Sequence, residues 1–98
     1  MKPVIVSSAA EIDAAEAFDW YESRSFGLGD RFLRSVRVTL TRIGDAPLAF
    51  QLVRRATRRA QVTGFPYSVY FRELGDVIVV VAIFHGKRGP VVRATRGI

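Results

Sequence analysis

The first half of the chain carries apolar residues at helical spacing. Three apolar positions recur at intervals of four and three, namely Ala14, Phe18 and Tyr21. Ser8 is followed three residues later by Glu11, a pair typical of a helix start because both side chains can cap free backbone N–H groups. The pattern therefore predicts a first helix that begins near Ser8 and ends at about Arg24.

A second helical pattern follows a short break at residues 25–30, which contains two glycines. Its apolar positions are Phe32, Val36, Leu40 and Ile43. Gly44 and Pro47 end this pattern, since glycine is favoured just after a helix and proline cannot continue one. Because the break is so short, we expect the two helices to form an antiparallel hairpin.

Strand patterns lie on both sides of the helices. Residues 4–6 are all β-branched and predict a short first strand. Residues 67–72 alternate, with Tyr67, Val69 and Phe71 on one face. Residues 77–84 are apolar at every position, which predicts a strand covered on both faces. The turn at residues 74–76 is tight, so these two strands should form an antiparallel hairpin.

Two further segments have weaker patterns. Residues 50–62 mix apolar and basic side chains and are interpreted as one or two extended segments, and residues 91–98 as a short edge strand. The whole chain of 98 residues suits one domain. We predict an α+β fold of order β-α-α-β-β-β, in which the helix hairpin packs on a three- to four-stranded antiparallel sheet that the first strand joins.

Composition removes several classes of protein. Hydrophobic residues make up 49% and charged residues 24%, as in globular domains. The chain has no cysteine and one histidine, which excludes disulfides and a thiol nucleophile and leaves too few ligands for a transition-metal site. We therefore expect neither a metal nor a cofactor. The chain begins unlike a signal peptide, and its longest apolar run is far shorter than a membrane span, so we expect a cytoplasmic protein.

The charge is unevenly distributed. Residues 1–53 carry six Lys/Arg against seven acids, whereas residues 54–98 carry nine against two, so the net charge of +6 comes from the C-terminal half. Thirteen of the fifteen basic residues are arginine, which forms fork-like contacts with phosphate and carboxylate. A basic half of this kind predicts an acidic partner, either a nucleic acid or an acidic protein segment.

Few residues offer catalytic chemistry. Five of the nine acids lie on the first predicted helix without a regular mutual facing, so we interpret them as a solvated helix face. The only histidine, His85, follows the apolar strand in the stretch FHGKRGP. For His85 a structural hydrogen-bonding role and a functional role remain open. Arg58 and Arg59 would point to opposite faces of a strand, so not all the arginines near them can line one surface.

The stretches WYE, GLGDRF, RRAQVTGFPYSVYF and HGKRGP with a later arginine occur in the order and spacing of a known family. In these features the chain resembles the RelE/ParE superfamily of bacterial toxins from type II toxin–antitoxin modules, over roughly residues 11–96. The resemblance implies a helix hairpin on an antiparallel sheet. It also implies a cognate antitoxin as partner, with an acidic segment that wraps the basic half and folds on binding.

The resemblance implies two activities. ParE-like members are described as poisons of DNA gyrase, and RelE-like members as ribosome-dependent endonucleases that cut mRNA. FPY and HxxRxP favour the ParE-like reading, and Arg93 stands where the family often has an aromatic residue. We therefore expect a ParE-like poison, with a RelE-like nuclease as the first alternative and a non-catalytic basic nucleic-acid-binding module as the second.

The expected site lies in the basic half. The predicted target-binding residues are Arg58, Arg59, Arg72, His85, Lys87, Arg88 and Arg96. Metal-free RNA cleavage needs a base, an acid and a cation, and only His85, Arg59 and Arg88 could supply them if they converge. Arginine is a poor proton donor because its pKa exceeds about 12, so the sequence favours a protein without catalytic activity.

Overall fold

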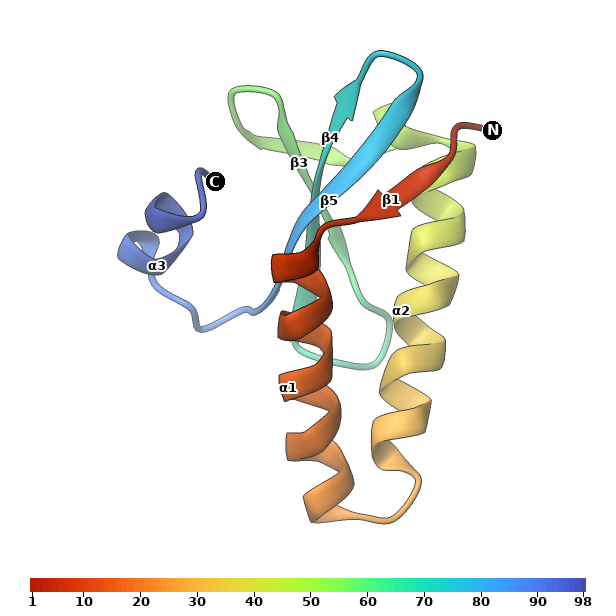
Figure 1. Cartoon of the computed structure of the whole chain (residues 1–98), viewed down its shortest axis with the longest axis vertical. Coiled ribbons are helices and arrows are strands. Elements are labelled where there is room, and N and C mark those ends of the chain that lie inside the picture. Colours follow the sequence, from red (N-terminus) through yellow and green to blue (C-terminus); the bar gives the residue numbers. More distant parts are fainter.

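A computed structural model describes the backbone of residues 1–98 and the side chains of all of them except residues 90 and 91. The elements in chain order are β1 (Val4–Val6), α1 (Ser8–Arg24), α2 (Leu28–Asp45), the 3-10 turn η1 (Pro47–Ala49), β2 (Gln51–Arg54), β3 (Thr57–Gln61), β4 (Tyr67–Leu74), β5 (Val77–His85) and α3 (Pro90–Thr95). Figure 1 shows α1 and α2 side by side as an antiparallel hairpin, with α3 set apart from them. The predicted α+β class and helix hairpin are confirmed.

The two long helices begin and end close to the predicted residues. Ser7, not Ser8, is the N-cap of α1, and its hydroxyl oxygen accepts a hydrogen bond from the Ala10 N–H at 3.2 Å. The buried positions of α1 are Ala10, Asp13, Ala17 and Tyr21. This face is rotated from the predicted one, because Ala14 and Phe18 are only partly buried. The structure describes no helix that is both long and apolar enough to cross a membrane.

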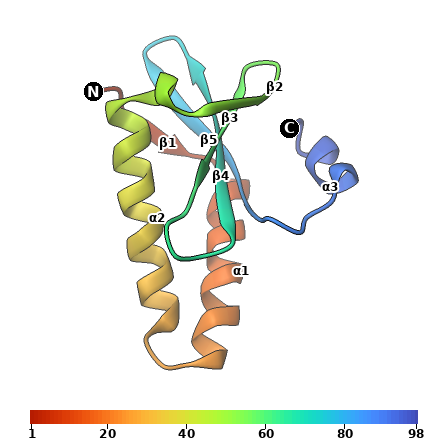
Figure 2. The same cartoon turned by 180° about the vertical axis from the view of Figure 1, so that it is seen from behind.

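The sheet has five strands in the order β1-β5-β4-β3-β2. The first strand joins it as predicted, but beside β5 and parallel to it, while all other neighbours are antiparallel. Residues 50–62, predicted as one or two extended segments, form the hairpin of β2 and β3 at the other edge. The strand count therefore exceeds the predicted three to four. Figure 2 shows this hairpin and β4 from behind.

The C-terminal segment corrects the prediction of an edge strand. Residues 90–95 form the short helix α3, which begins at Pro90. Proline is favoured at the first helical position because its fixed φ angle suits a helix and the N–H that it lacks would be unpaired there. Residues after α3 return to the sheet, where Ile98 is buried beside Tyr70 and Phe84.

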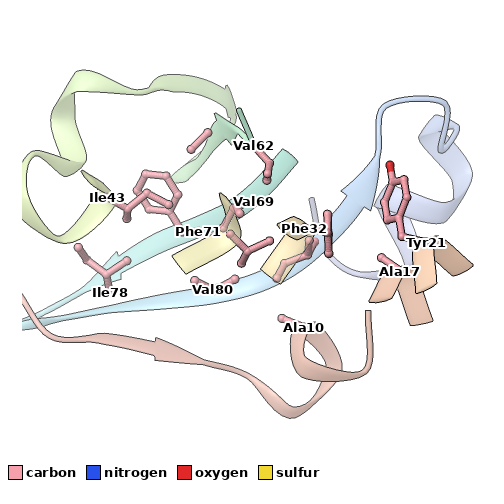
Figure 3. Packing of buried hydrophobic residues seen from close by; sticks show 13 residues of the cluster. Ala10, Ala17, Tyr21, Phe32, Ile43, Val62, Val69, Phe71, Ile78 and Val80 are labelled. Carbon is pink, nitrogen blue, oxygen red and sulfur yellow. The ribbon is translucent and has the colours of Figure 1, made fainter. Parts of the chain in front are cut away.

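The sheet separates two apolar layers. We call the side covered by α1 and α2 the helix face and the opposite side the far face. The main core fills the helix face, where Phe32, Val69, Phe71, Ile78 and Val80 are buried (Figure 3). The smaller cluster on the far face consists of Tyr70, Ala82, Phe84 and Ile98. Strand β5 contributes to both clusters, which confirms that it is covered on both sides.

An irregularity in β5 sets which side chains reach each face. Tyr70 pairs with Ala82, but Phe71 pairs with Val80, so Val81 is an extra residue in β5. Side chains alternate along a regular strand, and the extra residue shifts that alternation by one. Ala82 and Phe84 therefore face the second cluster, while His85, the partner of Tyr67, lies on the helix face.

Candidate functional site

His85 lies at the end of β5 in a pocket between the sheet and α1. This pocket, which we call the His85 pocket, has a volume of about 540 Å³ and is lined by Asp13, Glu16, Ala17, Trp20, Tyr21, Pro66, Tyr67, Ile83, His85 and Arg88. The His85 and Tyr67 rings meet edge to face, with centroids 5.2 Å apart. The Lys87 N–H donates to Nδ1 of His85 at 3.0 Å, so the neutral ring carries its proton on Nε2.

Tyr67 owes its position to an aromatic cluster beneath the His85 pocket. Its ring centroid lies 5.1 Å from that of Phe32 and 6.0 Å from that of Tyr21, and Phe32 and Tyr21 also contact Phe65. Such pairs add about 0.5–1.5 kcal/mol beyond their buried area. Burial raises the pKa of the Tyr67 phenol, the positive charge of Arg88 lowers it, and the negative charge of Glu16 raises it. Tyr67 is therefore a rigid, neutral hydroxyl at neutral pH.

Arg88 follows β5 and is exposed, with its guanidinium 4.9 Å from the centroid of the Phe84 ring. Lys87 is also exposed, and His85 is half-buried. These three predicted residues therefore lie together at one end of the sheet. The structure places Glu16 and Trp20 beside them, and sequence reasoning missed both. Glu16 and Trp20 lie four residues apart on α1, and this helical spacing was the signal in the sequence that could have identified them.

Arg59 lies elsewhere. It lines a second pocket, which we call the arginine basin, together with Val53, Arg54, Tyr70, Arg93, Ala94 and Ile98. In the register of β3 and β4, Arg59 pairs with Tyr70, whose ring belongs to the far-face cluster. His85 and Arg88 line the other pocket, on the helix face. The three catalytic candidates therefore do not share one pocket.

The other predicted target-binding arginines have partners within the chain. Arg58 is half-buried and donates to the carbonyl oxygen of Phe50 at 2.7 Å. Arg72 donates to the hydroxyl of Thr57 at 2.8 Å and to the carbonyl oxygen of Gly97. These bonds tie β2, β3 and the C-terminal segment to the sheet. Arg58 and Arg59 project to opposite faces of β3, as the strand geometry predicts.

Arg96 is bound to a buried carboxylate. Its two terminal nitrogens donate to the two oxygens of Asp13 at 2.9 and 3.0 Å, and Nη1 also donates to the carbonyl oxygen of Val81. Asp13 in turn accepts from the Ile83 backbone N–H at 3.0 Å. The hydrogen bond with Asp13 raises the pKa of Arg96 above its ordinary value. The pair therefore joins α1, β5 and the segment after α3.

Asp13 is the exception among the acids of α1. We predicted that these acids form a solvated face, but Asp13 is only 5% exposed. It lies four residues before Ala17 and three after Ala10, so its burial follows from helical spacing once that face is known. Among the described side chains, no three His, Asp or Glu residues come together as metal ligands.

A third hollow is apolar. This helix groove has a volume of about 650 Å³ and lies against α1, α2 and β1. Its lining residues are Val6, Glu11, Ala14, Ala15, Phe18, Asp30, Leu33, Val36, Arg37, Leu40 and Ile83. The half-buried Ala14 and Phe18 thus face this groove. Such a groove can accept apolar side chains of a partner segment.

Comparisons with known proteins agree with this architecture. A family model described as the ParE toxin of the type II toxin–antitoxin system parDE matches residues 4–90. The fold is also similar to a solved structure titled "Chromosomal ParDE TA system from P. aeruginosa", with a TM-score of 0.64 and 16% identity over 87% of this chain and 96% of that one. Among curated proteins, none matches the sequence.

Proposed function

The chain belongs to the family of ParE toxins of type II toxin–antitoxin systems, and from this membership we propose that it stops growth by binding and poisoning DNA gyrase. The observation that carries the proposal is the separation of the residues that a nuclease would need. Arg59 lines the arginine basin, whereas His85 and Arg88 line the His85 pocket. Metal-free cleavage needs a base, an acid and a cation around one phosphate, so this separation favours holding a target over cutting one.

The proposed contact with the target uses the residues whose polar groups remain accessible. Arg59, Lys87 and Arg88 are exposed, and His85 is half-buried. The predicted contacts Arg58, Arg72 and Arg96 are half-buried and donate hydrogen bonds within the chain, so in this proposal they support the surface and do not reach the target. Arginine suits such a role because its planar fork forms strong, oriented contacts.

The proposed partner that neutralises the toxin is a cognate antitoxin. Its apolar side chains would enter the helix groove, where Phe18 and Leu33 lie open to a ligand. Its acidic residues would contact the basic half, which carries nine Lys/Arg against two acids. An antitoxin segment that is disordered alone would fold on this surface. If the purified chain has no affinity for the product of the neighbouring gene, this part of the proposal is wrong.

A RelE-like nuclease is the second candidate, and one observation favours it. The His85 pocket brings the Tyr67 phenol and the Glu16 carboxylate close to His85 and Arg88. These groups comprise a base, a proton donor and a cation, although the pKa of Tyr67 is raised and its proton is therefore held more tightly. If this alternative holds, His85 and Tyr67 are the catalytic residues and Arg59 is not.

Induction of the chain in bacterial cells separates the two candidates. A gyrase poison produces double-strand breaks and a DNA-damage response while mRNA stays intact. Purified protein should then also inhibit supercoiling by gyrase. Cleavage of mRNA on ribosomes at codon intervals, abolished in His85→Ala and in Tyr67→Phe, would instead establish the nuclease and overturn the proposal.

Substitution of Arg88 tests the proposed surface. Arg88→Ala should abolish growth inhibition while the free energy of unfolding changes by no more than about 0.5 kcal/mol, as is usual for exposed positions. Arg34→Ala is the matched control, because Arg34 is an exposed arginine on α2. Toxicity that survives in Arg88→Ala, or a large loss of stability there, would show that Arg88 does not contact the target.

A further inference from the structure

The arginine basin collects positive charge on the far face of the sheet. It has a volume of about 370 Å³ and contains three arginines, Arg54, Arg59 and Arg93, but no acidic residue. The three come from β2, β3 and α3, so they converge through the tertiary fold. A concave site with three cationic side chains and no acidic one favours a negatively charged ligand.

Each guanidinium of the basin is held by an acceptor within the chain, and the acceptors of Arg59 and Arg93 are neutral. Arg54 donates to the backbone oxygen of Ile98 at 3.3 Å, Arg59 to Oε1 of Gln51 at 3.2 Å, and Arg93 to the carbonyl oxygen of Arg88 at 3.2 Å. The ion pairs within the described side chains are Lys2–Glu73 and Asp13–Arg96, so none involves the basin. The neutral acceptors of Arg59 and Arg93 position these two guanidiniums without cancelling their charge. Each guanidinium has five N–H donors, so most of them remain for a ligand.

The acids of the chain lie away from this face. All seven acids of residues 1–53 belong to α1 or α2, which cover the helix face. The two remaining acids are Glu73, which pairs with Lys2, and Asp76 in the turn between β4 and β5. The far face is therefore free of these acids. α1 carries five acids against one arginine, whereas α2 carries four arginines against two acids, so a polyanion would be attracted to the far face and repelled by α1.

The positive surface continues beyond the basin. A neighbouring pocket of about 490 Å³ shares Arg54 and Ala94 with it and adds Arg55 and Arg72, again without an acid. The two adjoining hollows together hold five arginines, Arg54, Arg55, Arg59, Arg72 and Arg93. Several adjoining cations fit a polymer with a charge on every unit better than they fit a single anion.

We propose that the arginine basin binds the phosphodiester backbone of a nucleic acid. The guanidinium forks match phosphate oxygens, which accept two parallel hydrogen bonds. The basin offers no imidazole or carboxylate side chain for proton transfer, so it holds the strand without cutting it. Contacts to phosphates carry no sequence information, and binding is therefore independent of base sequence. This inference shares Arg59 with the gyrase proposal but does not rest on it, since it concerns the toxin and a nucleic acid alone.

Fluorescence anisotropy with the purified chain tests the proposal. The probes are a labelled DNA strand of about 20 nucleotides, which exceeds the site of one small domain, its duplex, and an RNA of the same sequence. Titrations between about 50 and 200 mM salt should show affinity falling steeply, as expected when phosphates release counterions. The three probes distinguish which nucleic acid fits the basin best.

Variants in which neutral glutamine replaces a single arginine show where on the chain the nucleic acid binds. Arg59→Gln and Arg93→Gln should each weaken binding about three- to tenfold and lower the salt dependence by about one charge. Arg34→Gln on α2 removes the same charge outside the basin and should leave both quantities unchanged. Circular dichroism of each variant checks that the fold is retained.

Several results would overturn the inference. These are an absence of binding to all three probes, an affinity that Arg59→Gln and Arg93→Gln leave unchanged, and an equal loss in Arg34→Gln. Polyglutamate that displaces the strand at a lower charge concentration would assign the basin to an acidic protein segment instead. A chain that binds the probes through the basin but does not inhibit gyrase would support this inference and remove only the proposed gyrase target.

Discussion

Replacement of Asp13 with alanine removes a carboxylate that joins three parts of the fold. Asp13 on α1 accepts hydrogen bonds from the Ile83 N–H of β5 and from both terminal nitrogens of Arg96. The truncated side chain leaves a buried backbone donor and a guanidinium without these acceptors. We expect a large loss of stability and release of the C-terminal segment from the sheet.

The size of the expected loss of stability in Asp13→Ala follows from the burial of Asp13 and Arg96. Removal of one member of a buried ion pair costs about 3–5 kcal/mol. The Asp13 side chain is 4% exposed but that of Arg96 is 29% exposed, so water can solvate part of the released guanidinium. We therefore take the lower end, about 3 kcal/mol, which for a domain of this size lowers the Tm by about 12–24 °C. Asp13→Asn retains an acceptor for Ile83 and should cost about half as much.

Thermal and denaturant unfolding followed by circular dichroism measures these differences. Asp19→Ala is the control, because Asp19 is an exposed acid on the same helix and should change the free energy of unfolding by less than about 0.5 kcal/mol. A double-mutant cycle with Arg96→Ala isolates the pairwise energy, expected between about 0.5 and 3 kcal/mol. If Asp13→Ala is as stable as Asp19→Ala, the pair does not hold the three elements together and the reasoning is wrong.

Two further predictions concern the helix hairpin and the aromatic cluster. Gly29→Ala should lower the free energy of unfolding by about 1–3 kcal/mol, because the added Cβ would lie 2.8 Å from the Phe18 carbonyl oxygen. Gly89→Ala is the control, because its Cβ would meet no atom within 4 Å and stability should not change. Equal stabilities of the two variants would contradict the close approach at Gly29. Burial is the main cause that raises the pKa of both Tyr21 and Tyr67 above 10.0. Their contribution to the free energy of unfolding is therefore complete below about pH 10 and is lost as the pH rises through the folded-state pKa values. Tyrosinate absorbance should show two groups that ionise late, and Tyr67→Phe should remove one of them; an unchanged titration in that variant would refute the assignment.

The local hydrophobic pattern was sufficient to predict the helices and strands whose structure depends mainly on their own residues. The periodicity of α2, with Phe32, Val36 and Ile43 all buried, predicted a helix that the structure confirms, because each turn repeats the same contact with the sheet. The β4–β5 hairpin could also be predicted from the sequence, since the tight turn at Gly75, where φ is 62°, joins a strand of alternating pattern to an apolar one. Where the hydrophobic pattern was weak, in residues 91–98, the predicted strand was wrong and α3 formed instead.

The sites depended on contacts that no local pattern contains. The sequence by itself determined that the chain is basic in its second half, has a single histidine, and resembles one toxin superfamily. Only the tertiary structure decided that Arg59 and His85 lie in different pockets, and that Asp13 lies beside Arg96, 83 residues away. The physical reason is that sheet register and the extra residue in β5 choose the face of each side chain, and both arise from pairing between distant segments.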